Sequence, residues 1–296
     1  MSASQTILIT GGAGMLAQAL RSAVTRAFDG ANVLAPPRKE LDVGDAGRLE
    51  AFFRAHRPHI VFNCAAYTKV DLAEKERAAA DACNGAAVGN LARLCREHDA
   101  QLVHFSTDYV FDGTLRRPLR PDDPVGPQSA YGASKLLGER LIQEKSPARW
   151  MIVRTAWLYG AGGPNFVQTM VNVARAGKPL KVVNDQVGCP TYTVDLAEAA
   201  VGLAARGAHG IWHVTNAGQT TWFDFAAAIF EEFSLRPELS AISSDEWKST
   251  RPDSAVRPRY SVLDVEPVAK ALGRPMRHWR DALRAFKAEV DARGGF

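Results

Sequence analysis

The sequence lacks long apolar runs and paired cysteines. Ile7–Ile9, the first apolar stretch, follows no basic segment and is far too short for a signal-peptide core or a membrane span. We therefore expect a cytoplasmic protein. No C-x-x-C pair or nearby histidine pattern is present, which argues against a disulfide framework and a zinc site. We expect buried, reduced thiols at Cys64, Cys83, Cys95 and Cys189.

An excess of charge of one sign is also missing. The net charge is +4, and the basic residues are scattered apart from Arg116-Arg117 and the stretch from Arg251 to Arg259. That stretch is short and broken by prolines, so it is poorly suited to follow a nucleic-acid backbone. The charge is compatible with small anionic ligands. At 296 residues, 46% of them hydrophobic, the chain can form one domain or two unequal ones.

The first half of the chain alternates short β-rich apolar runs with longer helical patterns. This alternation is typical of βαβ units and predicts an α/β protein with a doubly wound parallel sheet, the Rossmann fold. The strands are expected at Thr6–Thr10, Asn32–Ala35, Ile60–Asn63, Gln101–Ser106 and Trp150–Arg154, and the helices at Met15–Phe28, Gly47–His56, Ala78–His98 and Tyr131–Glu144. Between the last two helices, Thr114–Ser129 is predicted to be a long ordered loop, a feature that is usually functional.

A glycine-rich turn follows the first predicted strand directly and opens a helix. It reads Gly12-x-Gly14-x-x-Ala17, preceded by Gly11 and containing Met15 and Leu16. Glycine permits the tight turn and lets the backbone approach a pyrophosphate, while the helix N-terminus offers free N–H groups. The turn therefore predicts a dinucleotide-binding site.

The end of the second predicted strand bears on the choice of cofactor. NAD sites usually carry an acidic residue there, but this strand runs into Ala35-Pro36-Pro37-Arg38-Lys39. Pairing of Arg38 or Lys39 with a 2′-phosphate predicts a preference for NADPH, with NADH as an alternative; a solvated basic turn explains the pattern equally well. Asp42 either contacts the adenine amino group or caps a helix. The small run Cys64-Ala65-Ala66 either admits a flat cofactor or packs in the core.

Tyr131 and Lys135 are four residues apart at the start of a predicted helix, so they share one helix face. A nearby ammonium stabilises phenolate and lowers the pKa of a phenol from about 10, which makes tyrosine a usable general acid for a carbonyl that receives hydride. A third member is expected at the carboxyl end of a neighbouring strand, where Ser106 and Thr107 stand.

After Thr155 the alternation of elements becomes irregular, starting with a glycine-rich turn at Gly160–Pro164. We predict a dinucleotide-binding domain from residues 1–157 plus about 186–210. A smaller C-terminal α/β substrate-binding domain is predicted from about 158–185 plus 211–296.

Over nearly its whole length the chain resembles the extended short-chain dehydrogenase/reductases, and within them the dTDP-4-dehydrorhamnose reductase family. The glycine turn and Tyr-x-x-x-Lys occur across the superfamily, whereas the strings beginning at Ser106 and Asn184 are more selective. The resemblance is carried by Gly11–Gly14, Asn63–Asp71, Ser106–Gly113, Tyr131–Leu136, Arg154–Tyr159 and Asn184–Thr191.

This resemblance implies an NADPH-dependent oxidoreductase that reduces the C4 keto group of dTDP-4-dehydro-L-rhamnose to dTDP-L-rhamnose. It implies Thr107, rather than Ser106, as the catalytic partner of Tyr131 and Lys135. Its implied cofactor contacts are Gly14, Met15, Leu16, Asp42, Val43, Ala66, Tyr67 and Thr68, to which the sequence adds Gly11, Arg38, Ala65, Tyr131 and Lys135. Thr107, Asp108 and Trp157 would face the sugar nucleotide. Arg257 and Arg259 either meet its diphosphate or belong to a solvated loop.

The chain departs from the family pattern at a few positions. Cys64 stands where alanine is frequent and Tyr67 where histidine is frequent, both near the expected nicotinamide. Some relatives bind Mg²⁺ through glutamates at a dimer interface, one of them in the first helix. This chain has Ala17-Gln18-Ala19 in that region, so we predict no metal site. The sequence therefore does not support Mg²⁺ dependence or that mode of dimer formation. A homodimer formed in another way remains an alternative.

Two other functions fit parts of the pattern. A sugar-nucleotide epimerase or 4,6-dehydratase uses the same cofactor fold, but dehydratases usually place an Asp-Glu pair after the threonine, and here Tyr109 follows Asp108. A non-catalytic NADP-binding regulatory subunit is similar to these reductases as well. The presence of Thr107, Tyr131 and Lys135 together favours the enzyme.

Overall fold

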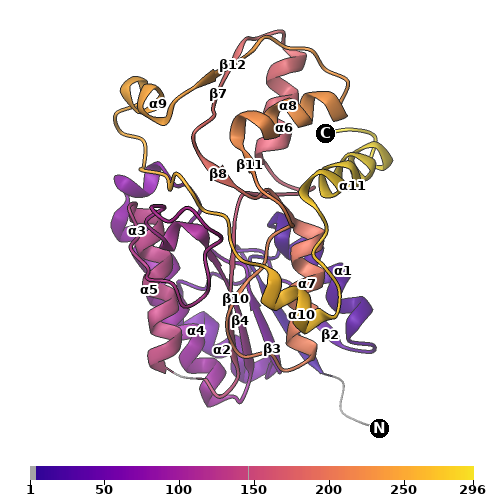
Figure 1. The fold of residues 1–296 in the computed structure, drawn as a ribbon. Helices are drawn as coiled ribbons and strands as arrows, with labels where there is room; N and C mark the ends of the chain where they lie inside the picture. The colour runs from indigo at the N-terminus through magenta and orange to yellow at the C-terminus, as the bar shows by residue number, and fades with distance from the viewer. Residues whose placement is uncertain (1–4, 146) are drawn as a thin grey trace.

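A six-stranded parallel sheet forms the centre of the computed structural model, which describes residues 5–145 and 147–296. The strand order is β10-β5-β4-β3-β1-β2 (Figure 1). The strands are β1 (Thr6–Thr10), β2 (Asn32–Leu34), β3 (Ile60–Asn63), β4 (Gln101–Thr107), β5 (Trp150–Thr155) and β10 (Gly210–His213). The middle strands are buried on both faces and are mostly apolar, with polar residues such as Asn63 and His104 at a few positions. The predicted doubly wound sheet is confirmed.

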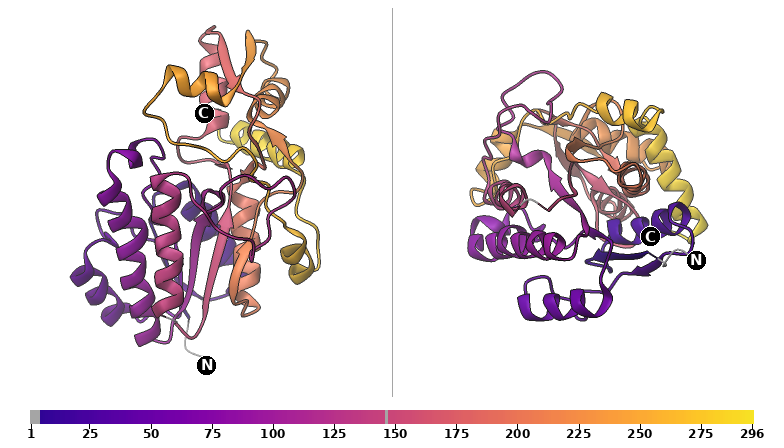
Figure 2. Two further views of the ribbon diagram at one scale, coloured as in Figure 1. Left: turned by 60° about the vertical axis from the view of Figure 1, so that its left-hand side comes forward. Right: turned by 90° about the horizontal axis from the view of Figure 1, so that it is seen from below.

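Helices line both faces of this sheet (Figure 2). One face is covered by α1 (Met15–Ala27) and α7 (Thr193–Ala205), and the other by α2 (Ala46–His56), α4 (Ala87–Glu97) and α5 (Ala130–Lys145). In α1, Leu16, Leu20 and Val24 recur every four residues, which puts one apolar stripe against the sheet. No helix in the described residues is long and apolar enough to cross a membrane.

The predicted helix Ala78–His98 is wrong as a single α-helix. It consists of α3 (Arg77–Asp81), the π-helical segment η2 (Ala82–Ala86) and α4. In η2, a Cβ on Gly85 would lie 2.4 Å from a methyl group of Leu137 on α5, so the two helices approach closely here. Asn84, fully buried in the same segment, binds the backbone of Tyr67. A π-turn in a helix often marks a functional position.

A second, smaller region lies beyond the carboxyl ends of the central strands (Figure 1). It has a core of its own, built around the aromatic rings of Tyr159, Phe225 and Phe286. Its elements are β6 (Leu158–Tyr159), α6 (Phe166–Arg175), β7 (Leu180–Val183), β8 (Val187–Gly188), β9 (Thr191–Tyr192), β11 (Thr220–Thr221), α8 (Trp222–Glu232), β12 (Leu239–Ile242), α9 (Ser244–Thr250) and α11 (Trp279–Ala292).

The predicted domain boundaries need correction in three places. Strand β10 pairs with β5, so residues 211–213 belong to the central sheet. In α10 (Glu266–Leu272), Val268 joins the core around α1 and α7, and Met276 does so just beyond it. Strand β8 pairs with β11, so residues 187–188 belong to the smaller region. These crossings connect the two regions several times.

The predicted loop Thr114–Ser129 forms no helix and no named strand. Arg117 makes a two-point ion pair with Asp123, at 2.7 and 2.8 Å, which closes the loop on itself. The Leu119 N–H donates to the carbonyl of Val262 at 2.8 Å. The loop therefore ties the sheet domain to the C-terminal third of the chain.

Candidate active site

The strand order reverses between β1 and β3, because the chain adds β2 on one side of β1 and β3 on the other. In such sheets ligands bind in the crevice at the carboxyl ends of these two strands. The glycine turn follows β1 there. A Cβ on Gly12 would lie 2.0 Å from the Ala35 carbonyl oxygen, and Gly11 has φ +65°. These positions therefore exclude ordinary side chains.

The residues around the turn fit a phosphate-bearing dinucleotide. Helix α1 begins after Gly14 without a side-chain cap and without an acidic residue in its first turn, which leaves first-turn N–H groups for an anion.

Within the described part of the chain, Ser106 Oγ, Thr155 Oγ1 and Asp108 Oδ2 are buried and have no hydrogen-bond partner. Ser106, the alternative to Thr107 in the sequence, thus makes no hydrogen bond through its hydroxyl that would give it a structural role.

Arg38 and Asp42 form an ion pair beside the turn. Arg38 Nε donates to Asp42 Oδ2 at 2.9 Å, and the Gly44 N–H donates to Oδ1 at 2.9 Å. The Gly44 hydrogen bond, followed by that of Arg38, lowers the pKa of Asp42. The capping alternative for Asp42 is wrong, because Asp45 caps α2 through the Arg48 N–H.

The segment after β3 is held by a residue that sequence reasoning missed. Asn84 accepts from the Tyr67 N–H at 2.9 Å and donates to the Tyr67 carbonyl at 3.0 Å and to Ser134 Oγ on α5 at 2.9 Å. Tyr67 also donates its hydroxyl to Glu76 at 2.7 Å. Asn84 thereby links the predicted cofactor segment Ala65–Thr68 to the helix that carries Tyr131. Its only sequence signal is an amide in an otherwise small and apolar helical stretch.

The three predicted catalytic residues come from β4 and α5. Ser129 accepts from the Gly132 N–H at 3.1 Å, and this cap starts α5 so that Tyr131 lies in its first turn and Lys135 one turn later. The Thr107 side chain lies close enough to Tyr131 to act on the pKa of its phenol. Thr107 also donates to Asp108 Oδ1 at 3.0 Å. The structure therefore brings the threonine and the tyrosine into contact.

Burial dominates the electrostatics of this group. It raises the pKa of Tyr131 to about 12, although the Thr107 side chain acts in the opposite direction. It lowers the pKa of Lys135 to about 8. Burial thus outweighs the expected effect of the Lys135 ammonium on the phenol. Tyr131 stays protonated at neutral pH, the form that a proton donor needs.

Asp108 is a buried carboxyl group at the junction of the two regions. Its side chain is 1% exposed and is hydrogen-bonded to Thr107 and to Ser261, which follows α9 in the chain. Burial raises its pKa to about 6. Oδ2 is itself buried and has no hydrogen-bond partner within the described residues.

Trp157 has an unusual backbone conformation, with φ at +48°. Its indole stacks on Trp222 with ring centroids 3.7 Å apart and planes at 11°. A Cβ on Gly188 would lie 2.6 Å from the Trp157 ring, so the absence of a side chain there makes room for it. The indole is therefore fixed on both sides, at a cost in backbone strain.

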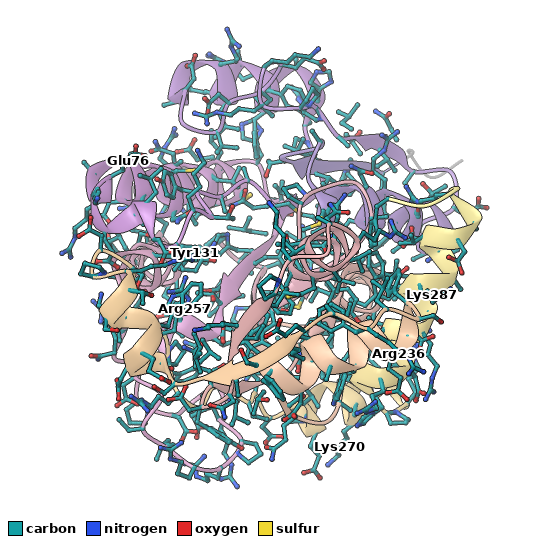
Figure 3. The ribbon with its side chains drawn as sticks, turned by 90° about the horizontal axis from the view of Figure 1, so that it is seen from above. Glu76, Tyr131, Arg236, Arg257, Lys270 and Lys287 are labelled. Carbon is teal, nitrogen blue, oxygen red and sulfur yellow. The ribbon has the colours of Figure 1, made fainter. Side chains whose placement is uncertain are left out.

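Arg257 lies at the edge of the reacting centre. Its Nη2 donates to both oxygens of Asp71, at 2.9 and 3.0 Å, and its side chain also hydrogen-bonds Tyr109. The Tyr109 ring meets the Tyr131 ring edge-on at 5.5 Å. Viewed from above, Tyr131 and Arg257 lie near each other although they come from different regions (Figure 3). The solvated-loop alternative for Arg257 is wrong.

Arg259 is ion-paired too, with Asp185 at 2.8 Å and Asp245 at 2.7 Å, which places it away from the Asp71 contact. All four cysteines are free thiols, with Cys95 and Cys189 buried. Across the ranges 5–145 and 147–296, no group of three His, Cys, Asp or Glu side chains could hold a metal ion.

Comparison with known proteins gives a consistent result. The family model described as the RmlD substrate binding domain matches residues 5–292. A dTDP-4-dehydrorhamnose reductase from Streptomyces griseus is 46% identical, covering 97% of this chain and 95% of the relative. A dTDP-4-keto-6-deoxy-D-glucose reductase from Streptomyces niveus is 41% identical, covering 93% and 94%. The crystal structure of the Bacillus anthracis dTDP-4-dehydrorhamnose reductase with NADP has a TM-score of 0.90 at 34% identity, covering 97% of this chain and 99% of that one.

Proposed function

Because the chain belongs to the RmlD substrate binding domain family, we propose that it is an NADPH-dependent reductase of a dTDP-linked 4-keto-6-deoxy sugar. The observation that carries this proposal is the grouping of Thr107, at the carboxyl end of β4, with Tyr131 and Lys135 in the first two turns of α5, at the sheet edge that the glycine turn also occupies. The specific reaction we propose is dTDP-4-dehydro-L-rhamnose to dTDP-L-rhamnose.

Each residue of the site has a separate role in the proposed reaction. Bound NADPH supplies the hydride that adds to C4. Met15 and Leu16, at the open start of α1, hold the pyrophosphate, and Arg38 meets the 2′-phosphate. Thr107 donates to the C4 carbonyl oxygen and orients it. Tyr131 transfers its hydroxyl proton to that oxygen, so the ketone gains one hydride and one proton and becomes an alcohol.

The proposed substrate contacts come from both regions. Arg257 is a cation at the edge of the site, suited to the diphosphate. The fixed face of Trp157 and the free Oδ2 of Asp108 are placed to contact the sugar. We propose Trp157 and Asp108 as the specificity-determining contacts and Arg257 as the contact to the diphosphate.

The test is NADPH oxidation by the purified protein over a panel of dTDP, UDP and GDP 4-keto-6-deoxy sugars, with product stereochemistry determined by NMR. We expect turnover with the dTDP sugars, and the product separates a rhamnose-forming enzyme from one like the Streptomyces niveus relative. An epimerase or dehydratase would consume no net NADPH. Binding of NADPH without oxidation of it on any substrate would favour the regulatory subunit and overturn the proposal.

Tyr131→Phe is the matched variant. It keeps the ring and removes the proton, so we expect NADPH affinity to be retained while kcat falls by about 10²- to 10⁴-fold. Unchanged turnover would remove Tyr131 from its proposed role. The preference for NADPH is tested by comparing kcat/KM for the two cofactors in wild type and Arg38→Ala. The cytoplasmic location and a homodimer stay predictions, the latter testable by light scattering.

A further inference from the structure

A row of buried polar side chains runs through the central sheet behind the reacting centre. Thr10, Asn63 and His104 lie side by side on β1, β3 and β4, and the row ends at Lys135 on α5. None is more than 2% exposed. The successive contacts are Thr10 Oγ1 to Asn63 Oδ1 at 2.6 Å, Asn63 Nδ2 to His104 Nδ1 at 2.9 Å and His104 Nε2 to Lys135 Nζ at 3.3 Å.

The direction of these hydrogen bonds is set at the far end of the row. The Ala65 N–H donates to Thr10 Oγ1 at 3.2 Å, and a backbone N–H cannot reverse. The Thr10 hydroxyl donates in turn to Asn63 Oδ1, and within the described residues it has no second acceptor. The Asn63 amide must then turn its NH₂ group toward His104.

This direction fixes the tautomer of His104. Burial, the largest cause, lowers the pKa of His104 well below its ordinary value, so the ring is neutral. A neutral imidazole has one N–H and one lone pair. Because Nδ1 accepts from Asn63, the proton is on Nε2 and faces Lys135 Nζ. Only an uncharged amine can accept it, while Nζ donates on its other side to the Phe105 carbonyl at 2.6 Å.

We propose that His104 is a positioning residue of this reaction: the row Thr10–Asn63 holds it as the Nε2–H tautomer, whose donor points at Lys135 Nζ and favours the neutral amine. The role of His104 in catalysis rests on the proposed function, whereas the hydrogen-bond geometry of the row does not. In the reduction Tyr131 loses a proton in every turnover. Lys135 lies one turn beyond Tyr131 on the same face of α5, and an ammonium that gives up its proton near neutral pH can return a proton to the tyrosinate more readily than an ordinary lysine, becoming a neutral amine.

The other titratable groups around Lys135 do not replace this effect. Glu139 on α5 is occupied by Arg154 in a buried pair at 2.7 Å. Burial raises the pKa of both Cys83 on η2 and Cys64 after β3, so both stay neutral thiols. His104 is thus the neutral neighbour whose hydrogen-bond direction acts on the charge of Lys135.

The first test measures the tautomer itself and needs no substrate. Protein labelled with ¹⁵N-histidine is examined by long-range ¹H–¹⁵N NMR at pH 8.5, and the His104 signals are identified by their loss in His104→Asn. We expect Nε2 protonated and Nδ1 as the acceptor. The Nδ1–H tautomer in the wild-type protein would overturn the proposal whatever the variants do.

The second test breaks the row at its far end. Thr10→Val keeps the shape but removes the hydroxyl donor, so Asn63 can turn, His104 can become Nδ1–H, and Lys135 can donate to Nε2 as an ammonium. We expect the His104 tautomer to change and the alkaline limb of kcat/KM to move up by about one pH unit. Thr10→Ser keeps the donor and should show the tautomer and the pH profile of wild type.

The outcomes are separable. A Val variant with the wild-type tautomer and the wild-type limb overturns the positioning role, even if wild type is a good reductase. Failure of wild type to oxidise NADPH overturns the proposed function and leaves the NMR result to decide the hydrogen-bond row. A pure loss of folding stability, measured by thermal unfolding, would appear in the Val variant without a shift of the limb and would likewise count against the proposal.

Discussion

Gly12→Ala tests the phosphate-binding turn most directly. The new Cβ would lie 2.0 Å from the Ala35 carbonyl oxygen and 2.9 Å from that of Pro36, and real Cβ atoms do not approach closer than 3.0 Å. The obstacle is backbone at the end of β2, so the turn and the start of α1 must shift by about 1 Å. A misplacement of about 1 Å costs on the order of 10²-fold in a positioned site. Crowding of this kind also destabilises by about 1–3 kcal/mol.

The assay is NADPH binding, followed by its fluorescence, together with urea unfolding. We expect the Kd for NADPH to rise about 100-fold in the folded variant. Gly47→Ala is the matched control, because its Cβ would meet only Asp45 Oδ1, at 3.7 Å, inside α2. That change should leave the Kd unaltered and raise stability by about 0.5–1 kcal/mol. A Gly12→Ala protein that binds NADPH as wild type does would refute the close-approach argument.

Three further changes probe other parts of the site. Trp222→Leu removes the ring under Trp157, and we expect the KM for the sugar nucleotide to rise roughly tenfold with little change in NADPH affinity. Glu139→Gln leaves the buried Arg154 without its counter-charge and should cost about 3–5 kcal/mol in urea unfolding. For Asp108, the folded-state pKa of about 6 lies above the ordinary value of 3.8, so its ionisation opposes folding as pH rises through this window. Asp108→Asn should therefore gain stability over wild type between pH 4 and 7, by up to about 3 kcal/mol.

Each of these has a clear contrary result. An equal loss of NADPH and sugar-nucleotide affinity in the Trp222 variant would indicate general disorder of the site. Glu97→Gln, which breaks the exposed pair with Arg93, should cost under about 1 kcal/mol, and a similar loss for Glu139→Gln would contradict the buried-pair argument. Parallel pH curves for Asp108→Asn and wild type would show that its carboxyl group does not ionise differently on folding.

Much of the sheet domain could be predicted because its signals are local. The apolar runs of β1, β3 and β4 and the turn at Gly12 each occupy a few consecutive residues. Ser129, Tyr131 and Lys135 likewise follow from the start of one helix. The predicted strand ends differ from the observed ones by one residue where β4 and β5 continue to Thr107 and Thr155. In these segments the local sequence pattern and the tertiary packing favour the same secondary structure.

The parts that sequence reasoning missed depend on contacts between distant residues. Asn63 and His104 are 41 residues apart and meet only because β3 and β4 are neighbours in register. A histidine inside an apolar strand gives no indication of its partner. The π-turn at Ala82–Ala86 was missed for the same reason, since its cause is the approach of α5 at Gly85. The return of Val268 to the first core likewise has no local signal.

The pairing of Arg257 changes how substrate recognition should be understood. Arg257 donates to both oxygens of Asp71, so a diphosphate bound as proposed would replace or share this ion pair. Exchange of one anionic partner for another gives a smaller net gain than capture by a free arginine. In the proposed reaction, the discrimination among sugar nucleotides then comes mainly from contacts with no such competitor, the fixed face of Trp157 and the unpaired Oδ2 of Asp108. Affinity for the diphosphate and selection of the sugar are thereby assigned to different residues.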